Sequence, residues 1–269
     1  LLFIHGWPLS GFTWRKLLPS LSRRFTCFTV DLAGAGDSDW KDTNDFSFHG
    51  HAAHLQEAAR ALGLDRYALI AHDTGATVAR RLAEIEGDRV SGVVAIDTEI
   101  PHHRPPLVPF FQKVLALPGS GFVFRKLLGS KRFVRSSAGF GGCFHDLSHV
   151  DGEFEDEFVT PLRASARRME GQIRYARGID WKQLDGLAEG HGKITAPVLF
   201  VWGDGDPFFP IERAKEMMTQ VKDCRGFVTI PRAKLLPHEE HPDAVLAHVE
   251  EFLASLPASR DLREARTTA

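Results

Sequence analysis

The sequence contains no apolar run long enough to cross a membrane, few cysteines and almost no net charge. A transmembrane helix needs roughly 18 or more consecutive apolar residues, and no segment of the 269-residue chain approaches that length. The three cysteines, Cys27, Cys143 and Cys224, are scattered without a CxxC pair, as is typical of reduced thiols in a cytoplasmic protein. A formal net charge of -2 provides no general attraction to nucleic acid or to an anionic membrane. We therefore expect a cytoplasmic globular protein with neither of these partners.

Sequence patterns typical of nucleotide-binding or metal-binding sites are also missing. The glycine-rich turn at 31–38 lacks both the GxGxxG pattern and a P-loop lysine. Among the histidines, only the cluster of His49, His51 and His54 approaches a ligand spacing, and we expect it to face solvent on a predicted helix. We therefore predict neither a nucleotide cofactor nor a metal site.

Apolar runs alternate with helical patterns along most of the chain. The runs are nearly continuous, as in strands of a parallel sheet that is buried on both faces. We predict strands at 1–5, 25–31, 67–71, 90–97, 197–202 and 225–230, and helices at 14–21, 46–62, 211–221 and 242–256. The pattern predicts an α/β fold, with a mostly parallel sheet and helices on both faces.

The alternation stops between residues 99 and 188, where the chain becomes rich in proline, phenylalanine and glycine. We interpret 99–188 as a helical cap, or lid, inserted after the strand at 90–97 into a core formed by 1–98 and 189–256. The polar tail at 257–269 is expected to be flexible. The phenylalanines of the cap predict an apolar pocket, and they are Phe110, Phe111, Phe122, Phe124, Phe140 and Phe144.

The stretch 67–79 predicts a very tight connection from a strand to a helix. An apolar run ends at Ala71, Asp73 follows, and a helical pattern begins after Gly75. Small residues around Asp73 are typical of the nucleophile elbow, in which the apex residue projects above the sheet. The alternative is that Asp73 only caps the following helix, which aspartate does well.

Three further motifs accompany this turn. They are His5-Gly6-Trp7-Pro8 after the first strand, Asp31 to Ser38 after the second, and Trp202-Gly203-Asp204-Gly205-Asp206 after a later strand. In this order the motifs resemble the α/β-hydrolase fold. Asp73 resembles the nucleophile of its aspartate branch, which contains haloalkane and haloacetate dehalogenases and epoxide hydrolases. In that family two strands precede the His-Gly loop, so we expect that N-terminal strands are missing before Leu1.

The resemblance implies covalent catalysis by Asp73. A carboxylate is ionised at neutral pH, so it can displace a halide or open an epoxide and form an alkyl-enzyme ester. Water then attacks the ester carbonyl with the help of a general base, and an oxyanion hole stabilises the intermediate. The family position of this hole is the backbone N–H groups of Trp7 and Thr74. No cofactor is needed, because the nucleophile and water perform the chemistry.

The acid that should orient the base is best matched by Asp206. Asp206 follows an apolar strand and precedes a proline, as the family acid does. Its neighbour Asp204 is a competing candidate. Some dehalogenases place this acid after the strand that precedes the cap, where Glu99 or Asp97 would serve.

The base is missing from its usual register, which falls on Leu235. His238 comes three residues later, and one early helical turn would bring it near the same face. We predict His238 as the base, and a structural role at the start of a helix is the alternative. Other candidates are His241 and the cap histidines His102, His103, His145 and His149.

The groups that would bind the leaving atom are incomplete. Dehalogenases usually hold the halide with a tryptophan after the nucleophile, but here Thr74 follows Asp73, although Trp7 is present in the first loop. Epoxide hydrolases usually use two cap tyrosines, but this chain has Tyr175 in the cap and Tyr67 in the elbow strand. We predict Trp7 and Tyr175 as substrate-binding residues. His5 and His72 are expected to hydrogen-bond the loops of the site.

Together these features predict a hydrolase that acts on a small molecule, most simply by dehalogenation or by epoxide hydrolysis. Two alternatives remain. One is a carboxylic ester or lactone hydrolase, and the other is a non-catalytic ligand-binding relative that lacks the usual base. We expect a monomer or a homodimer.

Overall fold

The computed structural model describes residues 1–105 and 108–257. The tail predicted at 257–269 lies, apart from its first residue, outside the described residues. Among the helices of the described part, none combines the length and the hydropathy needed to span a membrane.

Six parallel strands form one sheet, as the sequence predicts. The strands are β1 (Leu2–Ile4), β2 (Phe28–Val30), β3 (Tyr67–His72), β4 (Val90–Ile96), β5 (Val198–Gly203) and β6 (Cys224–Ile230). Their order is β2-β1-β3-β4-β5-β6, so β1 and β3 are neighbours, with Ile4 beside Ala71. The loop after β1 and the turn after β3 therefore leave the same end of the sheet side by side. In open parallel sheets, ligands bind at this kind of position.

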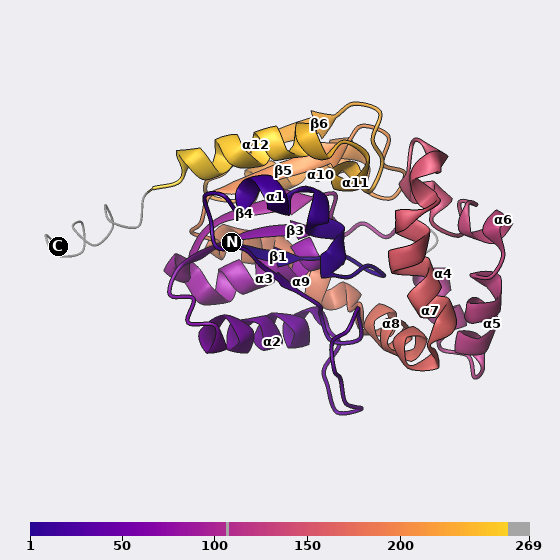
Figure 1. Ribbon diagram of the computed structural model, residues 1–269. Helices are drawn as coiled ribbons and strands as arrows, with labels where there is room; N and C mark the ends of the chain where they lie inside the picture. The colour runs from indigo at the N-terminus through magenta and orange to yellow at the C-terminus, as the bar shows by residue number, and fades with distance from the viewer. Residues whose placement is uncertain (106–107, 258–269) are drawn as a thin grey trace, which may run out of the picture.

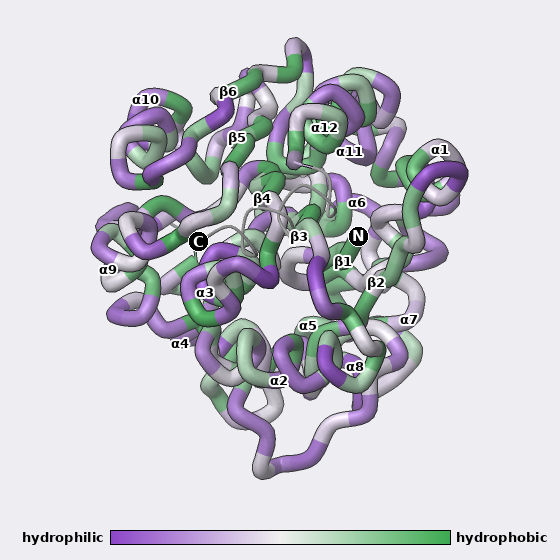
Figure 2. Tube along the Cα trace, turned by 90° about the vertical axis from the view of Figure 1, so that its left-hand side faces the viewer, coloured by the Kyte–Doolittle hydropathy of each residue, from purple (hydrophilic) through white to green (hydrophobic). Residues whose placement is uncertain are grey.

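Alternate residues of each strand face two separate apolar cores. Leu2 and Ile4 pack on one side of the sheet, and Phe3 packs on the other. The first side is covered by α2 (Phe48–Ala61), α3 (Thr74–Glu86) and α9 (Trp181–Gly190), and the second by η1 (Gly11–Lys16), α1 (Leu18–Leu21) and α12 (Pro242–Ser255). Figure 1 shows α12 above the sheet and α2 below it. In Figure 2 the hydrophobic colour concentrates on the interior strands.

The segment between β4 and β5 stands at one end of the sheet (Figure 1). It contains α4 (Val108–Leu115), α5 (Ser120–Leu127), α6 (Lys131–Val134), α7 (Thr160–Ala164) and α8 (Ala166–Gly178). These helices enclose a third apolar core, which also takes in Leu9 and Leu236 from the loops after β1 and before α11 (Pro237–Glu240). α9, which the predicted boundary at 188 assigns largely to the cap, packs with α2 and α3.

Two predicted helices are α-helical over only part of the range that the sequence indicates. The helix expected at 14–21 is the 3-10 helix η1 followed by α1, in which Pro19 occupies the first turn, where its missing N–H costs no hydrogen bond. The helix expected at 211–221 is α-helical only over α10 (Ile211–Glu216) and continues as a 3-10 turn at Met217–Thr219. Such tightened turns are common at helix ends.

Candidate active site

Asp73 occupies the apex between β3 and α3 in a conformation that non-glycine residues rarely adopt. Its φ and ψ are 52° and -134°. The amide of Asp73 donates to the carbonyls of Ile96 and Asp97, at 3.1 and 3.0 Å, and its carbonyl accepts from Thr98 Oγ1 at 2.9 Å. The Asp73 side chain makes no capping hydrogen bond to α3. Strain of this kind concentrates at functional sites, and the helix-cap alternative gains no support.

Two glycines leave the space that this turn needs. A Cβ atom at Gly6 would lie 2.6 Å from Asp73 Oδ2 and 2.9 Å from His72 Nδ1. A Cβ atom at Gly75 would lie 2.7 Å from the carbonyl oxygen of Ile4. The loop after β1 therefore approaches the Asp73 carboxylate closely only because Gly6 has no side chain.

Hydrogen-bond donors converge on one oxygen of the Asp73 carboxylate. The Trp7 amide donates to Asp73 Oδ2 at 2.9 Å and also to Thr74 Oγ1 at 2.9 Å. The Thr74 hydroxyl donates to the same Oδ2 at 3.3 Å. Thr74 is the first residue of α3, where the helix dipole favours negative charge. Trp7 and Thr74, the residues expected to form the oxyanion hole, thus both lie at Asp73.

Two further carboxyl groups, those of Asp97 and Asp206, lie after the ends of β4 and β5. Both oxygens of Asp97 accept from the Gly203 amide at 3.0 Å. Asp206 Oδ1 accepts from the Phe208 amide at 2.7 Å. The Asp206 side chain also hydrogen-bonds the Asp97 carboxyl group when one of the two is protonated, and no other donor reaches the buried Oδ2. Burial raises the pKa of Asp206 to about 7, and burial together with Asp206 raises the pKa of Asp97 well above its usual range. Asp204 is exposed and accepts from the Arg232 amide instead.

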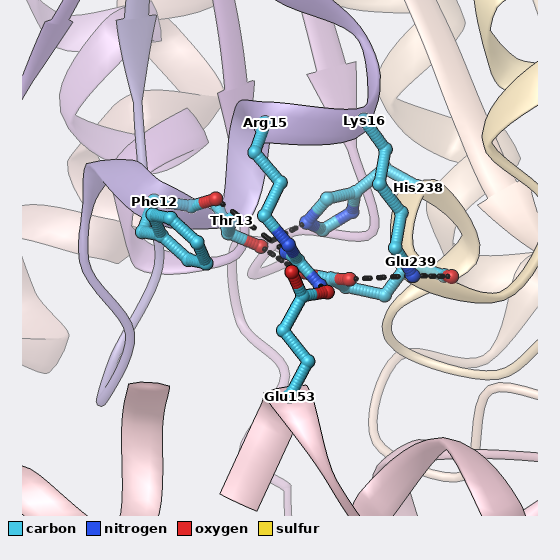
Figure 3. A network of polar contacts seen from close by, with 7 residues as sticks. All are labelled: Phe12, Thr13, Arg15, Lys16, Glu153, His238 and Glu239. Atoms are coloured by element: carbon cyan, nitrogen blue, oxygen red, sulfur yellow. Dashed lines mark hydrogen bonds and ion pairs between the residues drawn. The ribbon is translucent and has the colours of Figure 1, made fainter. Parts of the chain in front are cut away.

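His238 lies on Thr13 and not on Asp73. Its Nε2 is 2.8 Å from Thr13 Oγ1, and the Thr13 hydroxyl donates to Glu239, so Nε2 must carry the hydrogen. The imidazole stacks on Trp14 with ring centres 4.8 Å apart, in a network with η1 that Figure 3 shows. Burial lowers its pKa to about 3.

The local fold explains this position. α11 does begin early, at Pro237, but its turn places the His238 side chain against Thr13 of η1. Leu235 itself lines the cavity, and His72 Nε2 holds its carbonyl at 2.8 Å. The early turn that we expected is present, but the imidazole packs against the rings of Trp14 and His72, and its Nε2 bonds Thr13, not Asp73.

The remaining histidines are also engaged elsewhere. Within the described ranges no histidine lines the cavity. His5 bonds the Gly6 carbonyl and the Leu32 amide, and His72 bonds Leu235, as expected of loop-holding residues. The solvent-facing position expected for His51 is wrong, because that side chain is fully buried with both ring nitrogens unpartnered. The other candidates are also placed away from Asp73. His241 and His103 hydrogen-bond the backbone carbonyls of Arg232 and Phe208, and His102 lies beside Asp185. His145 is exposed and His149 is partly exposed in the segment between β4 and β5.

An apolar cavity of about 180 Å³ opens above Asp73. Of the cap phenylalanines named from the sequence, Phe111, Phe124 and Phe140 line it. Phe110 and Phe122 are exposed at the surface. Few polar side chains line the cavity within the described residues. These are Asp73, Thr74, Glu99, Ser137, Cys143 and Gln172. The cavity suits a small, largely apolar molecule.

The two residues expected to bind the leaving atom are already engaged. The Trp7 indole N–H donates to the carbonyl of Gln172 at 3.0 Å. The Tyr175 hydroxyl lies 2.9 Å from Thr74 Oγ1, and its ring packs on His51 with centres 4.5 Å apart. Tyr175 is 1% exposed and does not line the cavity. It reaches Asp73 only through the Thr74 hydroxyl.

Glu99 is the second carboxyl group in the cavity, and it is 4% exposed. Its Oε2 accepts from Thr77 at 2.6 Å and from Thr98 at 3.3 Å. Arg80, which is fully buried, donates to both threonine hydroxyls at 2.9 Å and to the Glu99 carbonyl at 2.8 Å. Sequence reasoning considered Glu99 only as a partner for a histidine and overlooked Arg80. A charged residue on the buried face of α3 was the available signal.

The two cavity carboxyl groups act on each other. Burial, followed by the charge of Glu99, raises the pKa of Asp73 well above its usual range, although the amides of Thr74 and Trp7 oppose the shift. Burial also raises the pKa of Glu99, against the opposing effects of Thr77 and Arg80. The freely ionised aspartate that the sequence predicts is therefore disfavoured while both side chains face an apolar cavity.

Comparisons with known proteins agree with this architecture. A family model described as the alpha/beta hydrolase fold matches residues 1–242. The chain is 36% identical over 280 residues to a soluble epoxide hydrolase of Corynebacterium, covering 95% of this chain and 90% of that protein. It is 28% identical over 255 residues to haloalkane dehalogenase 2 of Mycobacterium tuberculosis, covering 93% and 86%. The crystal structure of haloalkane dehalogenase DbeA from Bradyrhizobium elkani superposes with a TM-score of 0.77 at 22% identity, over 94% of this chain and 89% of that one.

The chain belongs to the α/β-hydrolase fold family. It is a hydrolase, and its relatives are named as epoxide hydrolases and haloalkane dehalogenases.

Proposed function

We propose that Asp73 attacks an sp³ carbon of a small organohalogen or an epoxide and forms an alkyl-enzyme ester. One observation carries this proposal: the carboxylate stands at a strained apex on the floor of an apolar cavity, with the Trp7 amide 2.9 Å from its Oδ2. The names of the relatives support the same two substrate classes.

The same donors suit the second step. When water attacks the ester carbonyl, negative charge develops on the carbonyl oxygen of the ester. The backbone N–H groups of Trp7 and Thr74 are the donors we propose for that oxygen. They oppose the rise in the pKa of Asp73, so they already stabilise negative charge on its carboxylate.

The predicted triad is supported unequally. Asp206 stays our candidate for the orienting acid, because no donor other than the Asp97 carboxyl group reaches its buried Oδ2. His238 stays the base indicated by the sequence, but its hydrogen bond to Thr13 and its lowered pKa argue against proton transfer at Asp73. The absence of any histidine from the described lining of the cavity is the observation that favours a second candidate, a ligand-binding relative that does not turn over.

Intact mass spectrometry with haloalkanes, halogenated acids and terminal epoxides tests the proposal. The wild type should form either an Asp73 adduct or a hydrolysed product. The Asp73→Asn variant should form neither. Asp223→Asn, which changes a half-buried carboxylate paired with Arg225 far along the chain, should behave as the wild type. An adduct that persists without product would identify the protein as one that attacks and stalls. No adduct and no product with any probe would refute the nucleophile.

A further inference from the structure

We propose that Glu99 is the acid–base residue of this site. It protonates the oxygen of an epoxide while Asp73 attacks the carbon, and it then takes a proton from the water that hydrolyses the Asp73 ester. The inference rests on the proposed role of Asp73, and it selects epoxides as the substrate class that this cavity is built to hydrolyse.

Glu99 is positioned to meet both the substrate and the water. Asp73 and Glu99 line the same cavity. One Glu99 oxygen, Oε2, is fixed by Thr77 and Thr98, and Thr98 also holds the backbone carbonyl of Asp73. Within residues 1–105 and 108–257 no other side chain bonds Oε1, and the further donor to this carboxyl group is the backbone amide of Glu99 itself. That oxygen is therefore free to exchange a proton with a molecule in the cavity.

Arg80 allows Glu99 to alternate between its two charge states. Its guanidinium contacts Thr77 and Thr98, which bond Glu99 Oε2, and it does not form a direct ion pair with the carboxylate. A direct pair would hold Glu99 permanently ionised. Through the hydroxyls, the positive charge instead stabilises the anion that remains after the proton has been given to the epoxide. Arg80 retains its charge near neutral pH, although burial lowers its pKa to about 10.

No other group in the cavity fits the role of proton donor. The Trp7 indole is bonded to Gln172, and the Tyr175 hydroxyl lies behind Thr74 outside the cavity. The Cys143 thiol does line the cavity, but burial raises its pKa, so it is a poor acid. A departing halide needs no proton, whereas the opening oxygen of an epoxide does. The acid in this cavity therefore matches the epoxide.

The proton balance closes over one turnover. Two buried carboxyl groups that repel each other as anions hold one proton between them. With that proton on Glu99, the Asp73 carboxylate forms a bond to the epoxide carbon, the C–O bond breaks, and the oxygen takes the Glu99 proton. The Glu99 anion then removes a proton from water as its oxygen bonds to the ester carbonyl. When the tetrahedral intermediate collapses, the hydroxyl proton passes to the departing alkoxide. A diol leaves, Asp73 is ionised and Glu99 is protonated again.

Two probes separate the acid step from the base step in Glu99→Gln. Opening and hydrolysis of 1,2-epoxybutane should fall by at least about 100-fold, the usual scale of lost acid–base catalysis. With 1-bromobutane, which needs no acid, Asp73 should still be alkylated, but the ester should accumulate because its hydrolysis lacks a base. Glu86→Gln, which changes another buried glutamate outside the cavity, should leave both reactions unchanged.

A rescue variant tests whether the lost function is proton transfer. Leu235 lines the cavity, and Asp206 Oδ2, which no donor other than Asp97 reaches, is the carboxyl oxygen that we expect to orient an imidazole placed at 235. Glu99→Gln combined with Leu235→His should hydrolyse the accumulated bromobutane ester and should still open the epoxide slowly. Ester hydrolysis at the wild-type rate in Glu99→Gln alone would overturn the proposal. Loss of alkylation by 1-bromobutane in that variant would reduce Glu99 to a structural role.

The wild type provides a test that does not depend on the folding of any variant. The charged and titratable groups that face Glu99 are Asp73, Arg80 of α3 and Tyr175 of α8, and only the two carboxyl groups share a proton near neutral pH. Single-turnover alkylation by 1-bromobutane should rise with pH to a plateau, whereas that by 1,2-epoxybutane should fall again at higher pH. Identical rising profiles would overturn the proposal. If wild type forms neither an adduct nor a product with either probe, the role of Asp73 fails and not the role of Glu99 alone.

Discussion

Replacing Asp206 by asparagine should remove a large part of the pH dependence of folding. Burial raises the pKa of Asp206 from 3.8 to about 7. The folded protein then binds this proton more tightly than the unfolded chain does. At a pH below the pKa of Asp206 in the unfolded chain, the stability that this bound proton contributes is fully present. As the pH rises, the unfolded chain ionises first, and the free energy of unfolding falls until the pH passes the folded value of about 7.

The magnitude follows from the shift. Each pKa unit corresponds to about 1.4 kcal/mol, so a shift of about 3 units corresponds to about 4 kcal/mol. This is an upper value, because Asp97 shares the proton and the site relaxes on ionisation. Asparagine keeps the shape and the Oδ1 acceptor for the Phe208 amide, but it has no proton to lose.

Urea denaturation at about pH 4 and about pH 8 checks the prediction. Between these values, wild type should lose up to about 4 kcal/mol more stability than Asp206→Asn does. Asp223→Asn, which changes a half-buried surface carboxylate paired with Arg225, should follow the wild type. Equal losses in wild type and Asp206→Asn would refute the buried, proton-holding carboxyl group on which the argument depends.

Three further substitutions test the geometry around the nucleophile. Gly6→Ala should destabilise the fold by about 1–3 kcal/mol and abolish Asp73 alkylation, since the added Cβ would lie 2.6 Å from Asp73 Oδ2. Thermal unfolding measures the loss of stability, and intact mass spectrometry measures the loss of alkylation. Gly186→Ala, in α9 with nothing within 4 Å of the added Cβ, should instead raise stability by about 0.4–1 kcal/mol. Thr74→Val should lower the free energy of unfolding by about 1–3 kcal/mol, because the buried Tyr175 hydroxyl loses its hydrogen-bond partner, and it should slow alkylation of Asp73. An unchanged melting temperature would contradict the bond to Tyr175.

The fold was predictable because its signal is local. Each strand is an apolar run, and the tight turn at Asp73 needs small neighbours whose crowding the structure displays at Gly6 and Gly75. The parallel order of β1 and β3 also follows from the position of the motifs after the strands. These features depend on residue types at short separations, which a single sequence contains.

The second half of the site was not predictable in the same way. A spacing of three residues between Leu235 and His238 indicates a helical turn but not the direction in which the side chain points. That direction depends on Thr13 and Trp14, more than 200 residues away in the chain. The position of Glu99 likewise depends on a contact between distant parts of the chain. Thr77 and Arg80 of α3 meet Thr98 and Glu99 only in the folded protein.

The cap shares its apolar core with the two loops that carry the site. Leu9 stands two residues after Trp7, Leu236 stands next to Leu235, and both side chains belong to the core of the cap helices. The Trp7 indole is also bonded to Gln172 of α8. The segment between β4 and β5 is therefore coupled to the Trp7 loop both by packing and by a hydrogen bond. The segment that roofs the cavity and the amide that contacts Asp73 are thus parts of one packed unit, so a substitution in the core around Leu9 and Leu236 is expected to reach the nucleophile as well.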